Sequence, residues 1–234
     1  MVIEEKASVT EFWQHFFTTQ QTQVPTISSF WYAMILLGLV VLAWLTALYH
    51  DRPAYVRFFK GLQLVQLVAL YGWYLLCRIP LDYSLPLYHC RIAMFGLVFL
   101  PDRWRFKQYI GLMGFSGAIF ALGYPVMDPY SFPHITGISF LLGHFALFTN
   151  GLIYLLNYFK KDNLSLTKIV VYTFVLDLFL LGVNQLTGGN YGILREPPFI
   201  DPSNVWFNYL VVSSVLSLAL ILTELGFRRF KRTQ

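Results

Sequence analysis

The sequence has few charged residues. Asp, Glu, Lys and Arg make up 12% of its 234 residues and hydrophobic residues 56%, whereas soluble domains carry about 25% charge. The hydrophobic residues form blocks of roughly 17 to 21, long enough to cross a hydrocarbon core of about 30 Å. This composition excludes an ordinary soluble protein and predicts an all-α, polytopic helical membrane protein. The net charge of +5 does not indicate nucleic-acid binding, because the basic residues follow the membrane topology described below.

A cleavable signal peptide, an internal repeat and a separate soluble domain are also missing. No charged segment followed by a short apolar stretch occurs near the N-terminus, as a signal peptide would require. Instead, Phe12, Trp13, Phe16 and Phe17 recur at helical spacing within residues 9–18. This pattern predicts a short amphipathic helix that lies on the bilayer surface.

Hydrophobicity predicts seven transmembrane helices. They run approximately from Phe30 to Tyr49, Phe58 to Leu76, Leu85 to Leu100, Gln108 to Tyr124, Gly137 to Leu156, Thr167 to Thr187 and Val205 to Gly226. The chain is thereby divided into an extracellular or interfacial segment (1–29), a transmembrane domain (30–226) and a basic cytoplasmic tail (227–234).

Lys and Arg alternate between the two sides of this predicted bundle. One side carries Arg52, Arg57, Lys60, Arg103, Arg105, Lys107, Lys160, Lys161, Lys168, Arg228, Arg229, Lys231 and Arg232. The other side carries Lys6, Arg78 and Arg195, and Arg91 lies within a span. Cytoplasmic loops are enriched in Lys and Arg. We therefore expect a multi-pass protein of the plasma membrane, with its N-terminus outside and its C-terminus in the cytoplasm.

Polar residues gather in the outer half of the predicted bundle. Cys90 lies roughly 8 Å below the outer end of the third span, and His144 roughly 10 Å below that of the fifth. The sixth span and the outer loops add Asn184, His134, Asn190 and Tyr191 to this layer. Ionisable residues inside a membrane are usually functional, so this layer is the predicted site.

A cysteine and a histidine at equal depth suit acyl transfer through a thioester. His144 would accept the thiol proton of Cys90, and Arg91 would stabilise the thiolate or extend to lipid phosphates. The predicted catalytic pair is thus Cys90 and His144, with no cofactor and no metal. Predicted substrate contacts, some of them donors to an oxyanion, are His89, Arg91, His134, Asn184, Asn190 and Tyr191.

Other interpretations of the same residues remain open. Cys90 could serve only as a small packing residue, and a disulfide with Cys77 would remove the nucleophile. His144 could simply bond a carbonyl of a neighbouring helix. Zinc could be bound by His89, Cys90, His134 and His144, although their spacing matches no compact zinc motif.

Small and polar residues form a stripe at helical spacing on the fifth span. The stripe consists of Thr136, Ser139, Gly143, Ala146 and Asn150. It predicts a face for close helix packing, from which His144 points away by about 100° or more. Three prolines in the preceding outer loop, Pro125, Pro129 and Pro133, predict a stiff segment, which serves either as a cover or as a lid over a lipid site.

Several segments resemble the YwaF family of bacterial integral membrane proteins. They are LPLYHCRIAM at the third span, GAIFALGYPVMDPYSFPHITGISFLLGHFALFTNGLIYLL, NQLTGGNYGIL and VWFNYL. That family is similar to animal TMEM-type transmembrane acyltransferases, which implies transfer of an acyl chain from a phospholipid to a lysophospholipid. By this resemblance Cys90 matches the nucleophile and His144 the base. Asn190 and Tyr191 fall in the family's polar segment, and Cys77 lies outside the pattern.

The leading hypothesis is therefore a CoA-independent phospholipid acyltransferase or transacylase. Its partners would be membrane phospholipids and lysophospholipids, and not nucleic acid. A lipid ester hydrolase with the same residue pair is the nearest alternative. A non-catalytic lipid-binding, transport or assembly protein is the alternative from a different class.

Overall fold

The computed structural model describes residues 10–198 and 204–232. These residues form helices joined by loops and contain no strand. The helices are α2 (Ser29–Tyr49), α3 (Pro53–Leu76), α4 (His89–Phe99), α5 (Arg105–Gly123), α6 (Ile135–Tyr158), α7 (Leu166–Thr187), the 3₁₀ helix η1 (Tyr191–Ile193) and α8 (Val205–Phe230). Residues 10–16 form a further short helix. Each of the predicted membrane segments therefore contains a helix.

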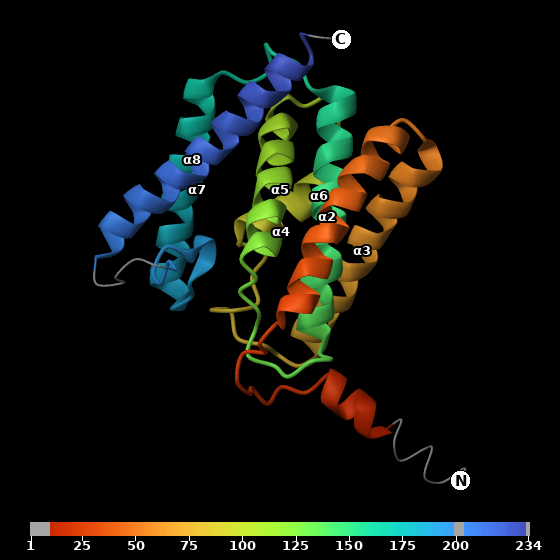
Figure 1. The fold of residues 1–234 in the computed structure, drawn as a ribbon. Coiled ribbons are helices and arrows are strands. Elements are labelled where there is room, and N and C mark those ends of the chain that lie inside the picture. Colours follow the sequence, from red (N-terminus) through yellow and green to blue (C-terminus); the bar gives the residue numbers. More distant parts are fainter. Residues whose placement is uncertain (1–9, 199–203, 233–234) are drawn as a thin grey trace.

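Helices α5 and α6 make the most extensive contact and form the centre of the bundle. Helices α3 and α4 pack on this pair, α2 packs against α6 and α5, and α8 reaches α5 from the other side. Helix α7 packs mainly on α8, and the two form a separate pair on the left of Figure 1. The described ends of the chain lie at opposite ends of the bundle (Figure 1).

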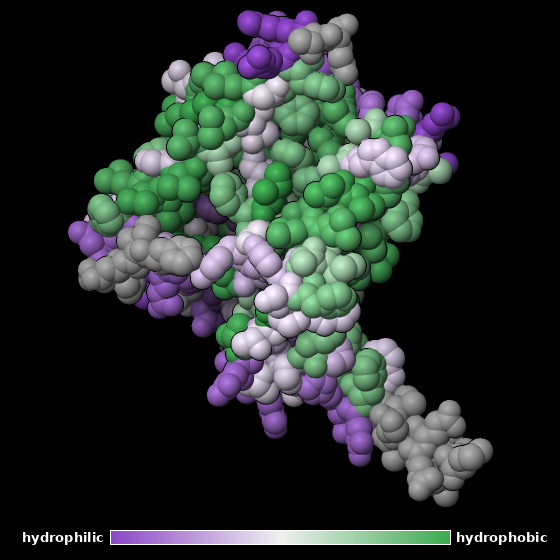
Figure 2. Space-filling view, in the orientation of Figure 1, coloured by the Kyte–Doolittle hydropathy of each residue, from purple (hydrophilic) through white to green (hydrophobic). Residues whose placement is uncertain are grey.

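Four of the described helices, α2, α6, α7 and α8, are long and apolar enough to cross a membrane. In α6, 72% of the apolar window is buried, whereas the share is 17% in α2 and 22% in both α7 and α8. The last three helices therefore present apolar side chains to their surroundings. Figure 2 shows the resulting hydrophobic surface around the middle of the molecule, with hydrophilic residues at its ends.

Helix α4 is shorter than the predicted third span, Leu85–Leu100. Its 11 residues reach about 16 Å, which is less than the hydrocarbon core of about 30 Å. Pro86 disfavours helical backbone in the residue before it, and Tyr88 at the N-cap is extended. The first residues of the predicted span therefore form a loop, and Cys90 becomes the second residue of α4.

The small-residue stripe of α6 packs against α3, as the sequence predicted. A Cβ atom added at Gly143 would lie 3.0 Å from Cδ of Gln66. The Gln66 amide also donates a hydrogen bond to the hydroxyl of Ser139. One end of the same face is held by Asn150, whose Nδ2 donates to the carbonyl of Phe59 at 3.0 Å. The close approach thus combines small residues with hydrogen bonds between helices.

The N-terminal segment docks onto the end of the bundle. Trp73 donates its indole N–H to the carbonyl of Phe17 at 3.0 Å, and Phe16 packs against the cluster that contains Trp73. Phe12 and Trp13 remain 45% and 50% exposed. Their exposure suits the predicted surface helix.

Candidate functional site

Helices α4, α5 and α6 meet at Gly114 of α5. A Cβ atom at this position would lie 3.4 Å from Cβ of Ala93 in α4 and 2.9 Å from Cδ1 of Leu147 in α6. Because Gly114 has no Cβ atom, the three helices approach one another closely at this point. The contact fixes the register of α4 and α6 relative to α5.

One helical turn away from this contact lie the two predicted catalytic residues. On α4 that turn carries Cys90, whose Sγ would lie 3.1 Å from a Cβ atom at Gly117 of α5. On α6, His144 lies three residues before Leu147, in the same direction along the bundle. The structure thus places Cys90 and His144 in one layer, but no hydrogen bond joins them in the described residues.

Cys90 and Cys77 are both free thiols. Cys90 is partly buried at the start of α4, and Cys77 caps the end of α3. The disulfide that would remove the predicted nucleophile is therefore not formed in this structure.

His144 is 8% exposed, and its orientation is fixed by its own helix. Its Nδ1–H donates to the carbonyl of Phe140 at 2.7 Å, and the two rings lie 4.5 Å apart. The acceptor therefore belongs to α6 and not to a neighbouring helix. With its proton on Nδ1, the neutral ring carries a lone pair on Nε2, which is the form that a general base requires.

Arg91 points toward two tyrosines of α3. Its guanidinium donates to the hydroxyls of Tyr71 and Tyr74 at 3.3 Å and 3.5 Å. It also lies over both rings, 5.6 Å and 5.8 Å from their centroids. No carboxylate of the described residues forms an ion pair with it. Asp128 attracts it at longer range without forming an ion pair, so the guanidinium still has donors for an anion.

His89, in contrast, is bound by a carboxylate. Its Nε2 lies 2.5 Å from Oδ1 of Asp177 in α7, and Oδ2 of this carboxylate accepts a hydrogen bond from Ser213 of α8 at 2.8 Å. Asp177 is completely buried. Gly192 of η1 allows the backbone to lie against the His89 ring, since a Cβ atom at this position would lie 3.1 Å from Cε1 of His89. Only the other ring nitrogen of His89 remains for a substrate.

Asn184 and Tyr191 close the C-terminal end of α7. The Asn184 side chain accepts from the backbone N–H of Tyr191 at 2.7 Å and donates to its carbonyl at 2.8 Å. The Tyr191 hydroxyl donates to the carbonyl of Leu81 and accepts from the N–H of Leu85. Burial raises the pKa of Tyr191 to about 12, so this hydroxyl keeps its proton. Both predicted substrate-binding residues are thus already bonded within the protein.

Asn190 and His134 likewise hold loops in place. Oδ1 of Asn190 accepts from the backbone N–H groups of Arg195 and Glu196. Nε2–H of His134 donates to the carbonyl of Thr18 at 3.0 Å, which ties the N-terminal segment to the start of α6. Both side chains are therefore bonded within the protein, and the structure gives no direct support for their predicted role in substrate binding.

The hypothetical zinc ligands are not brought together. His89, His134 and His144 bond to Asp177, Thr18 and Phe140, respectively. Within residues 10–198 and 204–232, no group of three or more His, Cys, Asp or Glu side chains is arranged to hold a metal ion.

Four residues near the site were not predicted as part of it: Tyr71, Tyr74, Asp177 and Ser213. A carboxylate in an apolar span is a signal in itself, because it needs a partner inside the membrane. The spacing of Tyr71 and Tyr74 places them on one face of α3, but nothing in the sequence shows that Arg91 lies opposite.

Apolar helices around a buried layer of ionisable side chains define a multi-pass integral membrane protein. Residues 16–223 match the model of the TMEM164 family, and the chain therefore belongs to this family. No curated protein and no solved structure matches the chain. The expected resemblance to TMEM-type membrane proteins is confirmed, whereas the relation to YwaF and to acyltransferases stays a prediction.

Proposed function

We propose that this protein is a CoA-independent phospholipid acyltransferase or transacylase that carries the acyl group on Cys90. The observation that supports it best is His144, a buried imidazole whose Nδ1 is bonded and whose Nε2 is free, in the layer of a free thiol. Arg91 adds a cation without a carboxylate partner. These are the three components that a thioester mechanism with a phospholipid requires.

In the first half-reaction, His144 takes the proton of the Cys90 thiol on Nε2. The thiolate attacks the ester carbonyl of a phospholipid, and the ester C–O bond breaks. His144 then returns the proton to the departing alkoxide, which leaves as a lysophospholipid. The products are a thioester on Cys90 and a neutral histidine.

In the second half-reaction, His144 takes a proton from the hydroxyl of an acceptor lysophospholipid. The resulting oxygen nucleophile attacks the thioester, the C–S bond breaks, and the thiolate recovers its proton from His144. Arg91 would hold the lipid phosphate while Tyr71 and Tyr74 orient its guanidinium. If water replaces the acceptor, the same residues catalyse ester hydrolysis.

A non-catalytic lipid-binding or transport protein is favoured by one observation. Cys90 and His144 are not hydrogen-bonded in the structure, and a protein that only binds lipid does not require these two side chains to come together. An acyltransferase instead forms this bond when the substrate is present, as catalytic hydrogen bonds often do.

Intact-mass measurement on vesicle-treated protein distinguishes these functions. Wild-type protein, Cys90→Ser and Cys77→Ser are each incubated with phosphatidylcholine vesicles. We expect an acyl adduct, removable by hydroxylamine, on the wild type and on Cys77→Ser but not on Cys90→Ser. Absence of an adduct from all three proteins, together with co-purified lipid, would support the binding function.

We also propose that the N-terminus lies outside and the C-terminus in the cytoplasm of a plasma-membrane protein. This orientation is supported by the basic residues: Lys60 and Lys107 both approach Asp102, and Lys231 bonds the carbonyl of Leu156 at the same end. A C-terminal epitope tag should become accessible to antibody only after the cells are permeabilised. Antibody staining of intact cells would instead show that the C-terminus lies outside the cell.

A further inference from the structure

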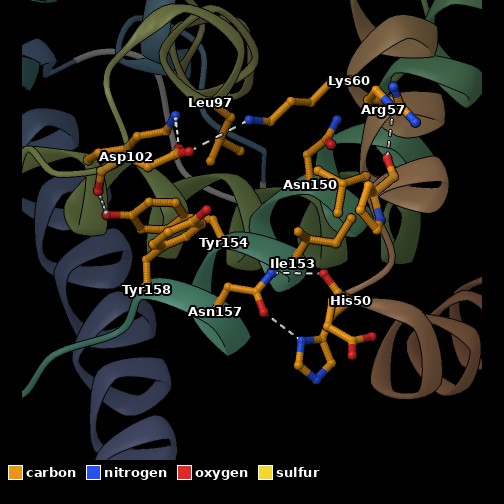
Figure 3. Close-up of a pocket in the computed structure, with 14 residues that line it drawn as sticks. His50, Arg57, Lys60, Leu97, Asp102, Asn150, Ile153, Tyr154, Asn157 and Tyr158 are labelled. Atoms are coloured by element: carbon orange, nitrogen blue, oxygen red, sulfur yellow. Dashed lines mark hydrogen bonds and ion pairs between the residues drawn. The ribbon is translucent and has the colours of Figure 1, made fainter.

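A cavity of about 280 Å³ lies at the basic end of the bundle (Figure 3), and Cys90 is not among the residues that line it. Its walls come from the α2–α3 connection, the start of α3, Asp102 after α4 and the last turns of α6. The proposed acyl transfer uses none of these residues. The volume falls near the lower end of ligand cavities, about 300 Å³, and thus suits a small group such as a lipid headgroup.

Two cations of α3 line the cavity with unused donors. Among the described residues, Arg57 bonds only through Nε, to the carbonyl of Pro53 at 3.3 Å. Lys60 lies 3.9 Å from Oδ2 of Asp102 and donates no hydrogen bond to a described residue. Both side chains are free to donate charge-assisted hydrogen bonds to a phosphate.

The nearby acids neutralise these two cations only in part. Asp102 is already bound by Lys107, which is 1% exposed and donates to its Oδ1 at 2.7 Å. Asp51 at the rim lies 3.9 Å from Arg52, and both side chains are exposed. The charged groups that line the cavity are three cations, Arg57, Lys60 and Lys107, and two acids, Asp51 and Asp102, which leaves an excess of one positive charge.

A buried acceptor without a donor lies deeper in the cavity. Asn150 is 4% exposed, its Nδ2 is used by the carbonyl of Phe59, and its Oδ1 has no partner among the described residues. Such an atom is unfavourable unless something donates to it. It lies two turns of α6 below Asn157 at the rim, or roughly 10 Å. Figure 3 shows it between Lys60 and the hydrogen-bonded pair His50 and Asn157.

We propose that this cavity binds a glycerol phosphate group. The phosphate contacts Arg57 and Lys60 near the rim, and a glycerol hydroxyl donates to Oδ1 of Asn150. A choline group has no donor, and an ammonium group would be repelled by the two cations. The required combination of anion and neutral donor occurs in phosphatidylglycerol and in soluble glycerol 3-phosphate.

Native mass spectrometry of the purified protein tests the cations. Phosphatidylglycerol, phosphatidylcholine and phosphatidylethanolamine with identical acyl chains are titrated separately. We expect wild type to prefer phosphatidylglycerol, and Lys60→Gln and Arg57→Gln each to weaken its binding about tenfold, the value of one charge-assisted hydrogen bond. Lys161→Gln is the matched control, because it removes one exposed charge outside the cavity at the same end.

Asn150→Ala tests the hydroxyl. Phosphatidylmethanol has the same charge as phosphatidylglycerol but no glycerol, so wild type should bind it more weakly. Asn150→Ala should bind both lipids equally while retaining wild-type helix content by circular dichroism. If glycerol 3-phosphate displaces the lipid at equal concentration, the site holds but its natural ligand is the soluble compound.

Two outcomes would overturn the proposal. One is an equal loss of binding for Lys60→Gln and Lys161→Gln, which would show attraction to the general charge of this surface. The other is a wild type that binds phosphatidylglycerol no better than phosphatidylcholine. Neither outcome bears on the thioester measurement with Cys90, so the two proposals fail independently.

Discussion

His89 and Arg91 flank Cys90 on α4, but their side chains contact different helices in different ways. His89 meets a buried carboxylate, Asp177, on the side of α7 and α8. Arg91 meets only hydroxyls and aromatic rings on the side of α3. Of the two ionisable residues next to Cys90, His89 is therefore paired with a carboxylate and Arg91 is not.

The difference separates a structural contact from a site that can accept a ligand. Helix α7 packs mainly on α8, and its bond to His89 is one of its links to the central helices. A buried pair of this kind holds elements in register, because neither partner tolerates the loss of the other. An unpaired cation contributes little to such packing but attracts an anionic substrate. The predictions that follow test this division, from the largest expected effect to the smallest.

Asp177→Ala should produce the largest loss of stability. It leaves His89 and Ser213 without their buried partner, and removing one member of such a pair typically costs about 3–5 kcal/mol. Thermal unfolding in detergent should show a clearly lower midpoint than wild type. Asp162→Ala, which removes an exposed acid, is the control and should leave the midpoint unchanged. Equal midpoints for both variants would show that the pair does not hold α7 in place.

Arg91→Gln should instead reduce acyl-adduct formation while the protein stays folded. Loss of one group that positions an anion typically lowers the rate about 10²-fold or more. The rate is followed by intact mass with phosphatidylcholine vesicles, together with the unfolding midpoint. The reverse pattern, with normal acylation and a large loss of stability, would move Arg91 to the structural side of the comparison.

Tyr71→Phe and Tyr74→Phe should each have a smaller effect on the same rate. Each removes one hydroxyl that orients the guanidinium but keeps the aromatic ring beneath the cation. We expect a decrease of about three- to tenfold, consistent with one hydrogen bond to a charged group. Tyr172→Phe, on α7, provides a control in which the same hydroxyl is removed elsewhere in the bundle. A rate that does not change in either variant would show that Arg91 acts without them.

His134, which lies outside the helical spans, should make the docking of the N-terminal segment depend on pH. Burial lowers its pKa below 6.5, partly opposed by its bond to the Thr18 carbonyl and by Asp128. The docked state therefore favours the neutral ring, so docking stability is present above pH 6.5 and is lost as the pH falls below it. Protection of residues 16–22 against hydrogen exchange, measured relative to the intrinsic rate at each pH, should decrease between pH 7 and pH 5. The protection in His134→Gln should depend much less on pH, and an unchanged dependence would assign the effect to another group.

The sequence predicted the parts of the fold that depend on hydrophobic periodicity. The seven helical segments and the packing face of α6 are examples, because Gly143 and Ser139 show their spacing without reference to other helices. The predicted length of α4 was wrong. The apolar run begins at Leu85, but Pro86 disfavours helical backbone in the residue before it, so the helix begins only at His89. Periodicity gives the face of a residue but not the helix opposite it. For this reason the partners of His89 and Arg91 could not be predicted.

The short α4 has a consequence for the electrostatics around Cys90. Its N-cap residue, Tyr88, makes no side-chain capping bond, and the amides of Cys90 and Arg91 have no partner within the helix. The aligned peptide dipoles of a helix place about half a positive charge at its N-terminus. A helix that crossed the whole membrane would present this charge to water. Because α4 begins only at His89, this positive end lies next to Cys90, and in the proposed acyl transfer it would stabilise negative charge on an acyl carbonyl oxygen.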